Sequence, residues 1–156
     1  MALRTISNNS SRLNYILSVA ALITGGSIYL FLRPAEPLFF QWIKWAGFES
    51  RVFSLRQYTL PFSSVLPEWF IYSLPNGLWA FAYSLLILSV WKNNNSRIKY
   101  FWYSTIPVLI FGVEIFQFSG ILPGTFCLVD IAFSIAGISA GYVFACVILK
   151  SNNHEK

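Results

Sequence analysis

The sequence predicts an all-α, polytopic membrane protein with four transmembrane helices. Hydrophobic residues make up 56% of its 156 residues, charged residues only 11%, and the mean hydropathy is +0.57. Four apolar blocks each approach the ~20 residues that a helix needs to cross ~30 Å of hydrocarbon. A helix of a soluble bundle would show a polar face every three to four residues, and these blocks show none. We therefore predict one membrane domain with spans at 13–32, 69–91, 100–118 and 125–149.

The first apolar block is expected to remain in the protein as a transmembrane helix. Its apolar stretch is longer than the ~7–15 residues usual in a signal peptide, and the RPAEP that follows is a poor cleavage site. The block therefore counts as the first span.

Residues 33–68 form an aromatic-rich segment between the first and second spans. The segment is too long for a turn and too apolar for a disordered linker, and its aromatic residues alternate with Gln41, Lys44 and Glu49. This mixture is typical of a short amphipathic helix in the headgroup layer. Two interpretations stay open: an aromatic belt that anchors the bundle, or a lid or lipid-gathering surface.

Basic residues near the span ends predict that both termini are cytoplasmic. An even number of spans puts the N-terminus, the loop around residues 92–99 and the C-terminal tail on one side of the membrane. These three regions carry Arg4, Arg12, Lys92, Arg97, Lys99, Lys150 and Lys156. The net charge of +5 suits an anionic inner leaflet, and nothing resembles a nucleic-acid-binding patch. Membrane lipids are therefore the expected partners.

Two carboxyl groups stand out within the apolar sequence VEIFQFSGILPGTFCLVD. Glu114 and Gln117 are three residues apart, so they share a face of the third span. Asp130 begins the fourth span after a tight turn, so the three polar groups are expected to approach one another in the outer half of the membrane. Ionisable residues inside a membrane are costly and usually have a function.

Three explanations of these carboxyl groups remain open. In the first, Glu114 is protonated, because burial disfavours the charged form, and it shares a hydrogen bond with Asp130 or Gln117. In the second, a cation pairs with the carboxylates, either a ligand or one of the basic residues of the outer segment: Arg33, Lys44, Arg51 or Arg56. In the third, the polar group joins the two helices, a contact worth about 0.6 to 2 kcal/mol.

The fourth span also carries a GxxxG pattern, formed by Gly137 and Gly141. Small residues at this spacing let a second helix approach closely. The pattern suits packing within one chain, association with a second copy, or docking to a membrane-protein partner. In the third span, Pro107 removes a backbone hydrogen bond and is expected to kink the helix two turns before Glu114.

The carboxyl-bearing stretch resembles the signature of VanZ-like membrane proteins. That signature is a Glu-x-x-Gln on one span, then a turn, an Asp, a polar residue one helical turn on, and a Gly one turn further. The matching positions are Glu114, Gln117, Asp130, Ser134 and Gly137. This chain has Gly124 where the family usually has Arg, and Ser134 where it usually has Asn.

The second span matches the family pattern less closely. The family often begins this span with an Asp-Lys pair, then a His and an aromatic residue one turn after it. Here Pro75, Asn76 and Trp79 replace the first three residues, and Tyr83 matches the fourth. The resemblance implies a small polytopic protein of the bacterial cytoplasmic membrane, linked in some cases to the cell envelope and low-level glycopeptide resistance, with no settled activity.

The sequence favours a binding function without a cofactor or metal. The one histidine, His154, lies in the polar tail, and no phosphate-binding loop or serine nucleophile motif is present. We expect an outer-leaflet site that recognises a lipid headgroup or a cell-envelope precursor, roofed by the aromatic segment. Its predicted residues are Glu114, Gln117, Asp130, Ser134 and Asn76.

Three other functions stay open. A non-catalytic accessory subunit would dock to a larger membrane complex through Gly137 and Gly141. A small transporter or channel would act as an oligomer, because four spans leave little room for a pathway in one copy. A carboxylate-pair hydrolase built on Glu114 and Asp130 is chemically conceivable.

Overall fold

The computed structural model describes residues 2–34, 39–91, 94–121 and 126–151, and this part of the chain is helical with no strand. The helices are α1 (Ala2–Phe31), α2 (Phe39–Trp45), α3 (Glu49–Ser63), α4 (Glu68–Tyr72), α5 (Leu74–Trp91), α6 (Ile98–Phe118) and α7 (Leu128–Ser151).

Four stretches are long and apolar enough to cross a membrane, which confirms the predicted fold class. They are Arg12–Phe31, Glu68–Trp91, Ile98–Phe118 and Leu128–Cys146. The predicted start of the last span, at residue 125, lies outside the described residues, and α7 begins at Leu128. The second span is divided at Ser73, between α4 and α5. Pro75, the second residue of α5, has no N–H to continue a hydrogen-bond ladder from α4 into α5.

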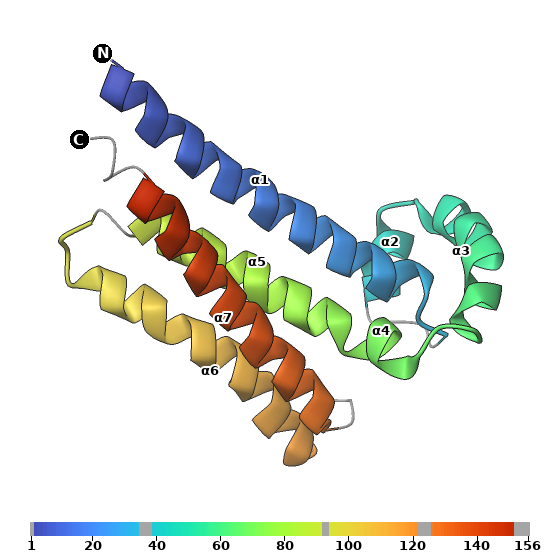
Figure 1. Cartoon of the computed structure of the whole chain (residues 1–156). Coiled ribbons are helices and arrows are strands. Elements are labelled where there is room, and N and C mark those ends of the chain that lie inside the picture. The colour runs from blue at the N-terminus through green and yellow to red at the C-terminus, as the bar shows by residue number, and fades with distance from the viewer. Residues whose placement is uncertain (1, 35–38, 92–93, 122–125, 152–156) are drawn as a thin grey trace.

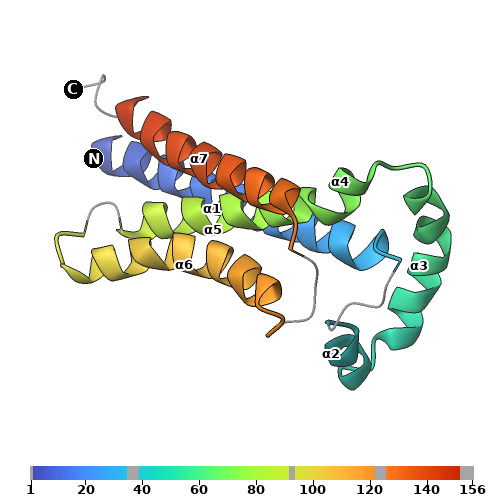
Figure 2. The same ribbon diagram turned by 90° about the horizontal axis from the view of Figure 1, so that it is seen from below.

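Helix α5 is the centre of the bundle. It makes most of its contacts with α7 and α1, whereas α6 contacts α5 and α7 more sparsely. Figures 1 and 2 show the start of α1 and the end of α7 at one end of the bundle, and helices α2 to α4 at the other. The α5–α6 connection lies at the same end as the start of α1, as an even number of spans requires.

Helices α5 and α7 pack backbone to backbone at their glycines. A Cβ added to Gly137 would collide with the carbonyl oxygen of Gly77, and one added to Gly141 would collide with Ser84 Oγ. At Gly77 an added Cβ would lie 2.9 Å from the carbonyl oxygen of Phe133. Small residues let two membrane helices approach this closely and increase their dispersion contact. The GxxxG face is therefore covered by α5 of the same chain.

Polar contacts join α5 to its other neighbours. Asn14 of α1 donates a 2.9 Å hydrogen bond to Ser89 Oγ, and the hydroxyls of Tyr83 and Thr105 lie 2.7 Å apart between α5 and α6. Near the other end of α1, Tyr29 packs against Trp79 with ring centroids 5.3 Å apart. Interhelical hydrogen bonds of this kind fix the rotation of each helix about its axis.

The aromatic-rich segment folds into α2 and α3 and is fastened to the end of α1. Arg56 is 4% exposed and donates hydrogen bonds to the carbonyl oxygens of Leu30, at 2.9 Å, and Arg33, at 3.0 Å. Thr59 Oγ1 donates to the carbonyl oxygen of Phe31 at 2.7 Å. A cation at a helix C-terminus satisfies unpaired carbonyls and complements the helix dipole. The segment therefore packs as an extension of α1, and its place in a headgroup layer stays a prediction.

Candidate ligand site between α6 and α7

Glu114 lies on the buried face of α6, with 7% of its surface exposed. The backbone N–H of Cys127, the residue before the first turn of α7, lies close enough to its carboxylate to act on it electrostatically. The first N–H groups of a helix lack partners in the helix and carry a partial positive charge. Glu114 therefore lies near the start of the next helix along the chain, where a negative charge is stabilised.

Asp130 lies in the first turn of α7, is 9% exposed, and is close enough to Glu114 to interact with it electrostatically. The two predicted carboxyl groups are therefore near neighbours, although they come from different helices. The N-terminus of α7 accounts in part for both, because it stabilises negative charge.

Each carboxyl group nevertheless has a buried oxygen without a hydrogen-bond partner among the described residues. These atoms are Glu114 Oε2 and Asp130 Oδ1. Leaving such an acceptor unsatisfied costs about 1–3 kcal/mol, more when it is charged. The site thus has acceptor capacity for a donor that the described part of the chain does not supply.

The other predicted site residues differ in how deeply they are buried. Ser134 is buried one helical turn after Asp130 on α7. Gln117 of α6 and Asn76 of α5 are half-buried, and within the described chain neither makes a hydrogen bond to a carboxyl group. The structure therefore brings together Glu114, Asp130 and the Cys127 backbone.

Within the described chain, no basic residue of the outer segment pairs with the carboxyl groups. Arg56 binds the end of α1, and the Arg33 guanidinium lies over Tyr29, 4.5 Å from the ring centroid, and over Tyr72, 5.0 Å from the centroid. The described residues form one salt bridge, between Lys44 and Glu49 at 3.6 Å. The predicted ion pair between a carboxylate of the site and a basic residue of the outer segment is therefore wrong. The reason is that α3 packs against α1 and not against α6 and α7.

The same packing contradicts the expected aromatic roof. Helix α3 packs against α1 and helix α2 against α3, so neither covers the carboxyl groups. The aromatic contact nearest to them along α7 comes from α4, where Trp69 stacks on Phe133 with ring centroids 5.7 Å apart. A hydropathy pattern does not show which ring Trp69 contacts, so this stacking could not be predicted from the sequence.

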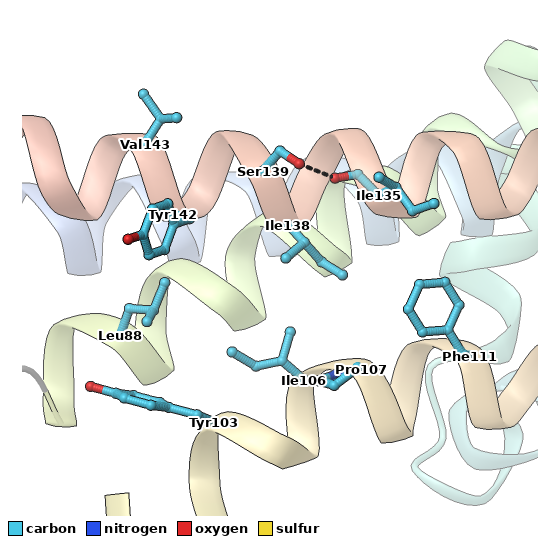
Figure 3. A pocket seen from close by; sticks show the side chains of 10 residues that line it. All are labelled: Leu88, Tyr103, Ile106, Pro107, Phe111, Ile135, Ile138, Ser139, Tyr142 and Val143. Atoms are coloured by element: carbon cyan, nitrogen blue, oxygen red, sulfur yellow. Dashed lines mark hydrogen bonds between the residues drawn. The ribbon is translucent and has the colours of Figure 1, made fainter. Parts of the chain in front are cut away.

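A cleft of about 520 Å³ lies between α6 and α7. Figure 3 shows Ile106 and Phe111 of α6 and Ile138 of α7 pointing into the gap between the two helices. Its lining residues are Leu88, Tyr103, Ile106, Pro107, Phe111, Ile135, Ile138, Ser139, Tyr142 and Val143.

The cleft is chemically apolar and leads toward the carboxyl groups. Ser139 donates its hydroxyl to the carbonyl oxygen of Ile135 at 2.8 Å, so it offers no free donor. Glu114 lies one helical turn beyond Phe111, and Ser134 one turn before Ile138, so the polar site adjoins the end of the cleft. The sequence predicted a kink at Pro107, which lines this cleft, but the other walls depend on the distance between α6 and α7.

The fold and the site define a polytopic helical membrane protein with a buried carboxyl pair beside an apolar cleft. Comparison with protein-family models, with curated proteins and with solved structures gave no match to this chain. Among the described residues no group of three or more His, Cys, Asp and Glu side chains could hold a metal ion, and His154 lies outside those residues.

Proposed function

We propose that this protein is a VanZ-like membrane protein that binds a lipid or lipid-linked envelope precursor. The headgroup is held at Glu114 and Asp130, and a hydrocarbon chain lies in the cleft between α6 and α7. The observation that carries this proposal is the pair of unpartnered buried oxygens next to an apolar cleft that opens between two membrane spans.

The chemistry of the cleft favours a lipid over a transported ion. A path for protons or ions through a membrane is lined by polar groups, whereas this lining is mostly aliphatic and aromatic. Its polar side-chain groups are the hydroxyls of Tyr103, Tyr142 and Ser139, and the Ser139 hydroxyl is already bonded. The resemblance to the VanZ-like signature supports the same site, since Glu114, Asp130, Ser134 and Gly137 are all buried.

The packing of α7 against α5 disfavours the alternative of an accessory subunit that docks to a larger complex through Gly137 and Gly141. Gly137 and Gly141 lie against α5, so a partner helix cannot use them without displacing α5. A partner that binds the last span would contact a different face of it.

The test is lipid retention by the purified protein, measured by native mass spectrometry alongside thermal unfolding in detergent. We expect the wild type to retain a phospholipid and the Glu114→Gln/Asp130→Asn double variant to lose it without a loss of stability. Glu68→Gln is the matched control, because Glu68 is exposed at the start of α4.

A second pair of variants tests the cleft. Ile138→Trp places a large ring in the gap and should also abolish lipid retention, while Val108→Trp changes an exposed residue of α6 that does not line it. Unchanged retention in both the carboxyl and the cleft variants would refute the proposal. Loss of stability in the carboxyl variants would instead make these residues a helix-joining contact.

A further inference from the structure

We infer that the ligand's headgroup carries a primary ammonium group, as in a phosphatidylethanolamine-type lipid. This inference rests on the proposed function and names the chemical class that the same site selects.

Charge is the first argument. Glu114 and Asp130 are 7% and 9% exposed, and among the described residues neither forms a salt bridge. The N-terminus of α7 contributes roughly half an elementary positive charge, which does not balance two carboxylates. An uncompensated buried charge costs several kcal/mol. A positive group at this position would remove that cost for ionised carboxylates, whereas an anionic phosphate would increase the repulsion.

Hydrogen bonding distinguishes a primary ammonium group from a quaternary one. Glu114 Oε2 and Asp130 Oδ1 are both acceptors without a hydrogen-bond partner in the part of the chain that the structure describes. A primary ammonium has three N–H donors and can serve two carboxylates at once. The quaternary ammonium of a choline headgroup has no N–H and would leave both oxygens unsatisfied. The site should therefore discriminate between two lipids that carry the same charges.

The cleft identifies the amine's source as a lipid. It lies between two membrane spans, has an apolar lining, and ends one helical turn from Glu114 and Ser134. Both unpartnered oxygens are closed to solvent, so the headgroup enters when the outer end of α6 moves away from α7. Helix α6 makes few contacts with its neighbours, and Pro107 interrupts its hydrogen bonds two turns before Glu114.

The experiment measures the affinity of delipidated protein in detergent for dioleoyl-phosphatidylethanolamine and for its N-methyl, N,N-dimethyl and choline analogues. We expect affinity to fall with each methyl group and to be roughly 10-fold or more weaker for the choline lipid, because charged hydrogen bonds are lost. Glu114→Gln and Asp130→Asn should flatten the series, and Glu68→Gln should not. Glycerophosphoethanolamine, which lacks the chains, should bind far more weakly than the lipid.

The outcomes separate this inference from the proposed function. Equal affinity across the methylation series, with binding still lost in the carboxyl variants, would leave the lipid site in place and overturn the ammonium assignment. Equal binding of glycerophosphoethanolamine would overturn the lipid source. No lipid binding by the wild type would refute the proposed function and this inference together.

Discussion

Gly137 of α7 lies directly against the backbone of Gly77 of α5, with no side chain between the two helices. This contact fixes the distance between the two most closely packed spans of the protein. It also fixes the rotation of α7, because Asp130, Ser134, Gly137 and Gly141 follow one another at intervals of three or four residues on one face.

The glycine contact predicts that a glycine-to-alanine substitution destabilises the protein in α7 but not in α6. Gly137→Ala should destabilise the protein by about 1–3 kcal/mol, because the new Cβ collides with the Gly77 carbonyl. Gly112→Ala in α6 adds a Cβ that meets nothing within 4 Å, and alanine forms helix better than glycine by about 1 kcal/mol. Thermal unfolding in detergent should therefore rank Gly112→Ala at or above the wild type and Gly137→Ala well below it.

The hydrogen bond between Asn14 and Ser89 predicts an energetic coupling between α1 and α5. A double-mutant cycle with Asn14→Ala and Ser89→Ala should give about 0.6 to 2 kcal/mol, the range of interhelical polar contacts in membranes. The same cycle with Asn14→Ala and Thr24→Ala should give none, because the Thr24 hydroxyl bonds Ala20 within its own helix. A zero value for the first pair would remove Asn14 as a determinant of the α1–α5 packing.

The contact of Arg56 with the end of α1 predicts local opening when it is shortened. Arg56→Gln loses the hydrogen bonds to the carbonyl groups of Leu30, Arg33 and Pro34. It also loses the packing of the guanidinium over Phe40, 4.7 Å from the ring centroid. Losing such buried charged hydrogen bonds costs about 1.5–3 kcal/mol each. Hydrogen exchange in α3 should accelerate, while α5 and α7 stay protected. Arg51→Gln, at an exposed position of the same helix, should leave the exchange unchanged.

The distribution of basic residues, together with the positions of the helix ends, predicts which cysteine variants are accessible from outside the cell. In a Cys127→Ala/Cys146→Ala background, a membrane-impermeant maleimide should label Ser64→Cys and Ser119→Cys in intact cells. Ser96→Cys should be labelled after permeabilisation, because it lies in the connection at the opposite end of the bundle. All three native serines are exposed. The reverse pattern would invert the predicted orientation, and labelling of Ser96→Cys with Ser119→Cys would contradict the four-span topology.

Much of the carboxyl site could be predicted from the sequence because its members lie close together along the chain. Only residues 119–127 separate α6 from α7, so the end of α6 that carries Glu114 is expected near the start of α7, where Asp130 lies. Closeness along the chain was not sufficient for Gln117, which is half-buried and makes no hydrogen bond to a carboxyl group within the described chain. Asn76 lies on a different helix, α5, so its place relative to the carboxyl groups depends on how α5 packs. The group that acts on Glu114 at the start of α7 is the backbone N–H of Cys127, and a side-chain pattern cannot reveal a backbone group.

The sequence by itself determined the membrane class, the four spans and the positions of the buried carboxyl groups. Hydropathy is a local property, and each span satisfies its own backbone hydrogen bonds, so neither depends on what the helix packs against. Tertiary structure decided which face of α7 meets α5, where Arg56 and Arg33 find their partners, and that an apolar cleft adjoins the carboxyl pair. These features depend on the rotation and separation of whole helices, which close glycine contacts and interhelical hydrogen bonds set.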